Sequence, residues 1–314
     1  MMLLAGCGSA PRQVGAPLMI ETRRTAWQSP FAAGEQIDTR HYRIYSTISN
    51  PRSLLGSVPG FMEAAHDNYL RLTGLADRAL SGPLHVYMVG TRAEWVALTQ
   101  KATGPLADKY AQIEAGGYCH NGVCVFWDIG PMATLSVASH EGLHQFFYHR
   151  LKQRLPAWLE EGLCATAEGY ELQGQDAVRF TPDRNVARFN NLRQAIVAGR
   201  WIDLKDLLVM DSGDITGRST EEAVGYYGQL WALAAFIRSR GDFHAGMFRL
   251  LADAEAGRFD KALKLTPAAM TALMGRPKLY NQALSEPLFR HYISGDLESF
   301  DREFQAFAKR LARL

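Results

Sequence analysis

His140-Glu141-Gly142-Leu143-His144 is the stretch of sequence from which the rest of the chain can be interpreted. On a helix, residues four apart face the same way with Cβ atoms about 5–6 Å apart, so both imidazoles can bind one metal ion. Glu141 is rotated off that face, so its carboxylate is better placed to act as a general base than as a ligand. This H-E-x-x-H run therefore predicts a Zn²⁺ site with its own base.

The flanking residues indicate that the run lies on a helix. Residues 133–139 lead into it and residues 145–148 follow it, with apolar residues at helical spacing, and Pro131 can begin the helix. A catalytic zinc site needs a third protein ligand. The metzincin arrangement would require glycine at position 147 and histidine at position 150, but the chain has Phe147 and Arg150. That class is excluded.

The next segment supplies a candidate third ligand. Residues 155–165 read Leu-Pro-Ala-Trp-Leu-Glu-Glu-Gly-Leu-Cys-Ala, in which the proline can begin a second helix. An H-E-x-x-H run followed by a W-L-x-E-G segment resembles the gluzincins, zinc metallopeptidases whose third ligand is the glutamate before that glycine. The resemblance implies that Glu161 is the third ligand. Periodicity supports this choice weakly, because Glu161 shares a face with Trp158 and Ala165, whereas Glu160 points nearer to solvent.

Two later segments extend the resemblance to the bacterial peptidase-MA-like group of gluzincins. Residues 226–233 read Tyr-Tyr-Gly-Gln-Leu-Trp-Ala-Leu and are similar to a Y-A/G-Q-x-W-A-L segment of that group, and residues 300–307 are similar to its closing helix. Gluzincins commonly bring a tyrosine or histidine from a later helix to the developing oxyanion. The resemblance gives this role to Tyr227, or else to Tyr226. Packing within the helical part of the chain is the alternative for either tyrosine.

The predicted elements indicate an α+β fold. We expect a zincin-like lobe over residues 34–170, in which a small mixed sheet backs the H-E-x-x-H helix, and a mainly helical lobe over residues 171–314, with the cleft between them. Residues 8–33 read as a tether. The other elements that we expect are strands at 38–49 and 83–89, a hairpin at 115–127, helices at 54–75 and 92–101, and helical breaks near 171–185, 211–219 and 275–285.

The hairpin contains two cysteines that can pair. Asn121-Gly122, a strong signal for a two-residue turn, lies midway between Cys119 and Cys124. In that register the two cysteines face each other with Cα atoms about 4.5 Å apart, which a disulfide allows. A metal role for this pair is the weaker alternative, since no second cysteine pair accompanies it. Cys164 is predicted to be a buried free thiol.

The N-terminal residues match a bacterial lipobox. Leu4-Ala5-Gly6-Cys7 places small residues before a cysteine, so we expect residues 1–7 to be the remnant of a signal and Cys7 to be lipidated. No basic and apolar segment precedes the box. Either the recorded start lies downstream of the real one, which we favour, or the match is accidental.

Composition limits the partners of the chain. With 47% hydrophobic residues, 21% charged residues and a net charge of +2, the 314 residues have an ordinary globular composition. Lysine and arginine are dispersed, which argues against a nucleic-acid partner. No apolar run approaches the roughly eighteen residues of a membrane helix, so we expect none. Nothing in the sequence specifies an oligomeric state.

Two residues near the H-E-x-x-H run do not fit a role as metal ligand or nucleophile. His149 lies five residues after His144 and leaves the ligand face of the helix, so we expect it at the surface or behind the ligands. Ser139 lacks the G-x-S-x-G elbow of a nucleophilic serine.

Taken together, these observations predict a zinc-dependent peptidase of the bacterial cell envelope, on its periplasmic face and anchored through Cys7, acting on a peptide or protein. In this prediction the three ligands hold Zn²⁺ and Glu141 takes a proton from the attacking water. The strand at residues 124–127 could pair with an extended substrate. The alternative is an envelope binding or assembly protein with a zincin fold and little or no peptidase activity.

Overall fold

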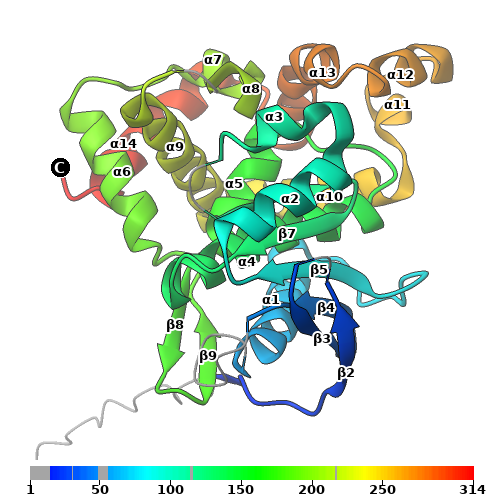
Figure 1. Cartoon of the computed structure of the whole chain (residues 1–314). Coiled ribbons are helices and arrows are strands. Elements are labelled where there is room, and N and C mark those ends of the chain that lie inside the picture. The colour runs from blue at the N-terminus through cyan, green and yellow to red at the C-terminus, as the bar shows by residue number, and fades with distance from the viewer. Residues whose placement is uncertain (1–14, 30, 49–55, 114–115, 216–217) are drawn as a thin grey trace, which may run out of the picture.

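The computed structural model describes residues 15–29, 31–48, 56–113, 116–215 and 218–314. These residues form a mainly helical α+β fold with two sheets, so the expected class is confirmed. Figure 1 shows most strands of the larger sheet in the lower part of the molecule and most of the later helices in the upper part. The lipidation expected at Cys7 lies outside the described residues.

The larger sheet has the strand order β2-β3-β4-β5-β7-β6. Neighbours along β4, β5 and β7 run parallel, and the other neighbours are antiparallel. The strands are β2 (Arg23–Gln28), β3 (Ala33–Asp38), β4 (Tyr42–Ser46), β5 (Leu84–Val89), β6 (Gly117–His120) and β7 (Val123–Trp127).

The start of this sheet differs from the expectation. Residues 23–28, which we expected within a tether, form β2 and pair along their length with β3. The tether was wrong for these residues, and β2 gave no strand signal because it is a mostly exposed edge strand with no apolar stripe. The single strand expected at 38–49 is the end of β3, a turn and then β4.

The strand β7 shows why the sheet needs helices on both faces. Successive side chains of a strand alternate between its faces. Val125 and Trp127 pack against Trp95 of α2 (Arg92–Thr103) in one buried cluster, whereas Cys124 and Phe126 belong to the main core. That core also contains α1 (Val58–Thr73) and α4 (Pro131–Arg150), so β7 is apolar at almost every position.

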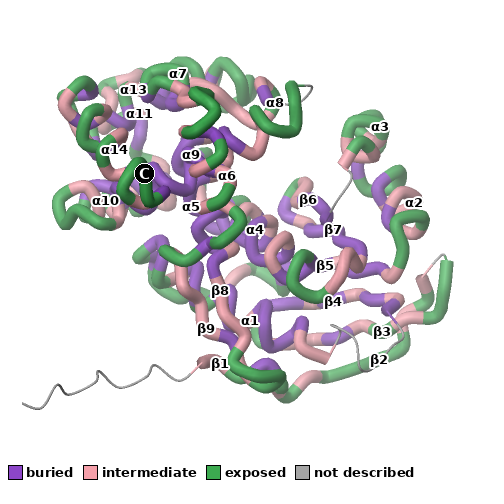
Figure 2. Tube along the Cα trace, turned by 90° about the vertical axis from the view of Figure 1, so that its left-hand side faces the viewer, coloured by how far each residue is buried: buried purple, intermediate pink, exposed green. Residues whose placement is uncertain are grey.

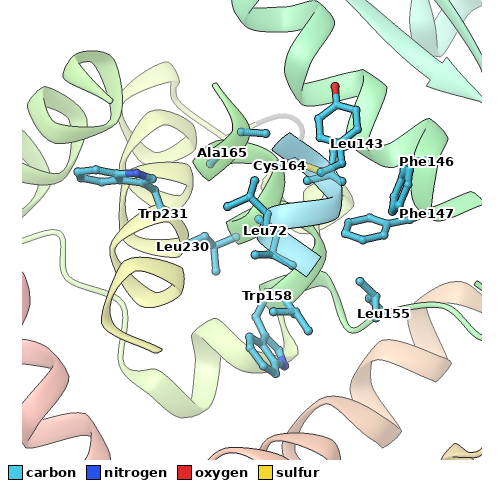
Figure 3. Packing of buried hydrophobic residues seen from close by; sticks show 14 of the residues in the cluster. Leu72, Leu143, Phe146, Phe147, Leu155, Trp158, Cys164, Ala165, Leu230 and Trp231 are labelled. Atoms are coloured by element: carbon cyan, nitrogen blue, oxygen red, sulfur yellow. The ribbon is translucent and has the colours of Figure 1, made fainter. Parts of the chain in front are cut away.

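The helices that follow α4 share this main core. Figure 3 shows side chains of α4, α5 and α9 meeting around Leu72 of α1, and Figure 2 shows the same buried band running through the interior. The later helices are α5 (Ala157–Ala167), α6 (Val186–Val197), α7 (Leu204–Val209), α8 (Ser212–Ile215), α9 (Thr220–Ser239), α10 (Gly241–Ala256), α11 (Phe259–Ala262), α12 (Pro267–Met274), α13 (Pro277–Tyr292) and α14 (Leu297–Leu311).

Two expected breaks need correction. The break near 171–185 contains a hairpin of β8 (Tyr170–Gln173) and β9 (Ala177–Phe180), and β1 (Ala16–Pro17) pairs with β9 in a second sheet. The break near 275–285 is confined to residues 275–276, because α12 ends at Met274 and α13 begins at Pro277. Within the part of the chain that is described, no helix has the length and apolarity needed to cross a membrane.

The absence of a side chain at Gly142 lets α4 approach α1 closely. A Cβ added at Gly142 would lie 2.5 Å from the hydroxyl oxygen of Tyr69, well inside van der Waals contact. That hydroxyl donates a hydrogen bond of 2.8 Å to the Ser139 carbonyl, one residue before the H-E-x-x-H run. Tyr69 is fully buried, so it has no room to withdraw.

We expect Gly142→Ala to lower the free energy of unfolding by about 1–2 kcal/mol, because overpacking of about 1–3 kcal/mol outweighs the better helix propensity of alanine. In a Tyr69→Phe background the loss should largely disappear, since the clashing oxygen is gone. Gly241→Ala, at an open helical position, is the control. Urea denaturation measures each value, and an equal loss in both backgrounds would contradict the packing account.

Candidate metal centre

Two histidines of α4 present one nitrogen each to the same point. His140 Nδ1 lies 2.7 Å from Glu168 Oε1, and His144 Nδ1 lies 2.8 Å from Glu160 Oε1. A carboxylate can only accept, so each Nδ1 carries the proton that it donates. Both Nε2 atoms are therefore left on the opposite edges of the rings, which is the arrangement of histidine ligands with a carboxylate behind them.

The predicted third ligand, Glu161, meets both rings. Its Oε2 lies 3.4 Å from His140 Nε2 and 3.7 Å from His144 Nε2. Ligand atoms at about 2.0–2.2 Å around one tetrahedral ion are about 3.3–3.6 Å from one another, which is close to the two distances from Glu161 Oε2. Glu161 Oε2 is buried without a hydrogen-bond partner, whereas Oε1 accepts from the Ser212 hydroxyl at 2.7 Å. A metal ion would satisfy the unpaired oxygen.

The electrostatics of the centre suit a cation. Burial opposes the charge on His140, but the adjacent carboxylates of Glu161 and Glu168 outweigh it and raise the His140 pKa to about 9. Burial alone would raise the pKa of Glu161, yet the charge of His144 and the contact with His140 hold it well below its usual value. Protons on the imidazoles thus balance the carboxylate in the metal-free protein, and a bound metal would replace them.

The carboxylates behind the histidines were not found from the sequence. Glu168, at the end of α5, accepts from Arg188 Nε at 2.8 Å and Arg188 Nη2 at 2.5 Å, and from Asn185 Nδ2 at 2.9 Å. Although burial opposes it, the charge of Arg188 helps to lower the Glu168 pKa to about 2. The sequence signal that could have identified Glu168 is its spacing of seven residues, two helical turns, from Glu161. Glu160 is more exposed than Glu161, as expected, but its contact with His144 Nδ1 was not predicted.

Glu141 lies beside the centre and not in it, as its position on the helix predicts. Its Oε2 accepts a hydrogen bond of 2.9 Å from the backbone N–H of Cys119 on β6. Burial raises the pKa of Glu141, and the charges of His144 and His140 oppose the rise. The carboxylate therefore stands between the helix and the end of the sheet, facing the same cleft as the histidines.

The two cysteines of the hairpin face each other on adjacent strands. Cys119 and Cys124 are cross-strand partners across the Asn121-Gly122 turn, in the predicted register. Both are thiols here, and Cys124 Sγ donates to the Glu141 carbonyl at 3.4 Å, so the disulfide stays a prediction.

Cys164 is a buried free thiol, as predicted. It is also a second candidate ligand, because its sulfur and one nitrogen of each histidine lie within 4.8 Å of one another. Burial raises its pKa, so the sulfur carries its proton in the metal-free protein.

The structure separates the two tyrosines proposed for the oxyanion. Tyr227 lines the cleft, its ring centroid is 6.4 Å from that of His140, and Arg188 lies over its ring at 5.2 Å. Burial and then the charge of Glu161 raise its pKa, so the phenol keeps its proton. Tyr226 is fully buried, and its hydroxyl donates to the Met210 carbonyl at 3.4 Å.

The centre lies on a cleft of about 1000 Å³. One wall is β6, whose Tyr118, Cys119 and His120 line the cleft, and the opposite wall includes α8 and the start of α13. The prediction that residues 124–127 pair with a substrate was wrong. These residues lie in β7, which already has β5 and β6 as neighbours on its two sides. The edge of the sheet that borders the cleft is β6.

His149 and Ser139, which the sequence excludes as ligand and nucleophile, lie outside the centre. His149 Nε2 lies 3.0 Å from the carbonyl of Gly122 in the hairpin turn, so it braces the hairpin against α4. The Ser139 hydroxyl donates to the Ala167 carbonyl at 2.7 Å and is fully buried.

No protein-family model, curated protein or solved structure matches this chain.

We expect Glu168→Gln to weaken Zn²⁺ binding about 10- to 100-fold, because the amide cannot balance Arg188 or hold the His140 ring as firmly. Competition with a chromophoric chelator measures the affinity. Glu171→Gln, a partly exposed carboxylate paired with Arg179, should leave the affinity unchanged. Equal Zn²⁺ affinity for wild type and Glu168→Gln would show that Glu168 does not support the centre.

Proposed function

We propose that this protein is a zinc-dependent peptidase of the gluzincin type, with His140, His144 and Glu161 as the metal ligands. The observation that carries the proposal is the buried, unpaired Oε2 of Glu161 facing two imidazole nitrogens at 3.4 and 3.7 Å. The resemblance of the H-E-x-x-H and W-L-x-E-G segments to that family points the same way.

The residues around the ligands suit hydrolysis of a peptide bond. When bound, Zn²⁺ supplies Lewis acidity and lowers the pKa of a coordinated water. Glu141 takes the proton from the attacking water and later donates it to the leaving amine. The raised pKa of Glu141, which follows from burial, makes its carboxylate a stronger base than an exposed glutamate.

Two further parts of the cleft can hold a peptide. The edge strand β6 has no strand neighbour among the described residues on its outer side, so an extended substrate can add to the sheet there. This would bring the substrate past Glu141, which already accepts from Cys119 on the same strand. The Tyr227 phenol, whose ring centroid is 6.4 Å from that of His140, can donate to the oxygen that becomes negative.

The proposal includes attachment to the bacterial cell envelope through a lipidated Cys7, with the catalytic part facing the periplasm. It rests on Leu4-Ala5-Gly6-Cys7 alone. Mass spectrometry of the protein expressed from the full upstream reading frame tests it, and an unmodified Cys7 would reject the anchor.

Two substitutions should separate metal binding from chemistry. His144→Ala should lose Zn²⁺ and some thermal stability, because metal binding is coupled to the local fold. Glu141→Gln should retain stoichiometric Zn²⁺ and lose nearly all cleavage of a peptide library, since no base remains. Metal analysis and library cleavage measure the two properties. If wild type binds Zn²⁺ but cleaves nothing, the protein is a binding or assembly protein and the peptidase proposal fails.

Adjacent tyrosines provide a matched pair for the oxyanion role. We expect Tyr227→Phe to lower kcat about 100-fold with little change in KM or Zn²⁺ content, because the hydroxyl acts on charge that develops in the transition state. Tyr226→Phe removes the same atom from a site outside the cleft and should change kcat much less. Steady-state kinetics decide, and equal values of kcat for wild type and Tyr227→Phe would remove the role.

A further inference from the structure

The walls of the cleft carry four cations that the proposed reaction does not use. They come from three elements: Lys109 from α3 (Ala107–Tyr110), Lys152 and Arg154 from the loop between α4 and α5, and Lys278 from α13. Lys278 pairs with Asp214 at 2.5 Å. The other three side chains are exposed and form no ion pair with any described residue.

The carboxylates of the same cleft are already engaged. Asp211 accepts from the backbone N–H of Gly213 at 2.8 Å and of Asp214 at 3.1 Å. The other three lie in or beside the metal centre and each accepts from a neighbour: Glu141, Glu160 and Glu161. Among the described residues of the cleft, the charged side chains without a partner are therefore the three cations, and a bound divalent ion would add positive charge.

Arg154 is close to the centre on the helical side. The Tyr280 hydroxyl donates to the Arg154 carbonyl at 2.5 Å. Burial raises the pKa of Tyr280, and the nearby charges of Arg154 and Glu160 act on it in opposite directions. Arg154 lines the same cleft as Glu160, the partner of His144 Nδ1.

Lys109 lies on the other wall. It precedes Tyr110, whose hydroxyl lies 3.1 Å from His120 Nδ1 at the end of the edge strand. Figure 2 shows α3 apart from α8 and the other helices of the opposite wall. A peptide lying along β6 would therefore meet a cation on the sheet side and two more on the helical side.

We propose that the cleft selects peptides with carboxylates near the scissile bond, and that Lys152 and Arg154, with Lys109 opposite, determine this preference. The preference in cleavage rests on the proposed peptidase function, whereas the preference in binding does not. Each exposed cation of this kind contributes about 2- to 5-fold in affinity. A carboxylate can come from an acidic side chain or from a free C-terminus, and the test distinguishes the two.

The test uses one peptide scaffold with glutamate, glutamine or lysine on both sides of the cleaved bond, each as free acid and as C-terminal amide. Binding to the Zn²⁺-loaded Glu141→Gln protein is measured by fluorescence anisotropy, and kcat/KM is measured with wild type. We expect glutamate peptides to exceed glutamine peptides about 5- to 20-fold in both assays at low salt, and this ratio should shrink in high salt. Weaker binding of every amide than of its free acid, with glutamate and glutamine peptides equal, assigns the recognised carboxylate to the C-terminus.

Charge-removing variants connect the preference to the cleft. Introducing Lys152→Gln with Arg154→Gln should reduce the glutamate-to-glutamine ratio at least threefold. Lys309→Gln removes an exposed charge on α14, outside the cleft, and should leave the ratio unchanged. Thermal unfolding checks that each variant is folded.

The outcomes separate this inference from the proposed function. If no peptide is cleaved but the charge preference in binding persists, the inference stands and the peptidase function fails. If all three peptides bind equally and are cleaved with the same kcat/KM, as free acids and as amides alike, the function stands and the inference is overturned. Absence of binding to every peptide also overturns the inference, as does a preference that survives loss of both cations.

Discussion

The negative charge of Glu161 must be balanced where α4 meets α5, in a place that excludes most water. Burial makes an unpaired carboxylate costly, and the structure meets this cost with the two imidazoles of α4 at 3.4 and 3.7 Å. Each imidazole is in turn held by a carboxylate, and the inner one, Glu168, is held by Arg188. The centre is therefore a series of alternating charges that extends from α4 through α5 to α6.

The surrounding fold keeps these two helices close and leaves one side open. Gly142 allows α4 to approach Tyr69 of α1, and Gly162 places α5 against the backbone of α9, because an added Cβ there would lie 2.9 Å from the Leu230 carbonyl oxygen. On the open side, the free edge of β6 borders the cleft. The same close packing that buries the charges also directs Nε2 and Oε2 toward the space where a metal and a peptide could bind.

The elements with strong periodicity were predictable from the sequence, and so were the residues of the centre. The H-E-x-x-H run, Glu161 and the Asn121-Gly122 hairpin follow from spacing and from a resemblance, and the hairpin register is as predicted. The strand β2 was missed because its exposed edge has no apolar pattern. Glu160 and Glu168 were missed because their partners depend on how α4 crosses α5, a tertiary feature that the spacing within either helix does not contain.

The identity of the third ligand is the most direct test, since Glu161 and Cys164 both lie near the two histidines. Zinc K-edge X-ray absorption of the Zn²⁺-loaded protein separates oxygen from sulfur ligands by distance. The account predicts only nitrogen and oxygen neighbours at about 2.0–2.2 Å, with no change in Cys164→Ala. A sulfur neighbour at about 2.3 Å that Cys164→Ala removes would contradict the assignment of Glu161.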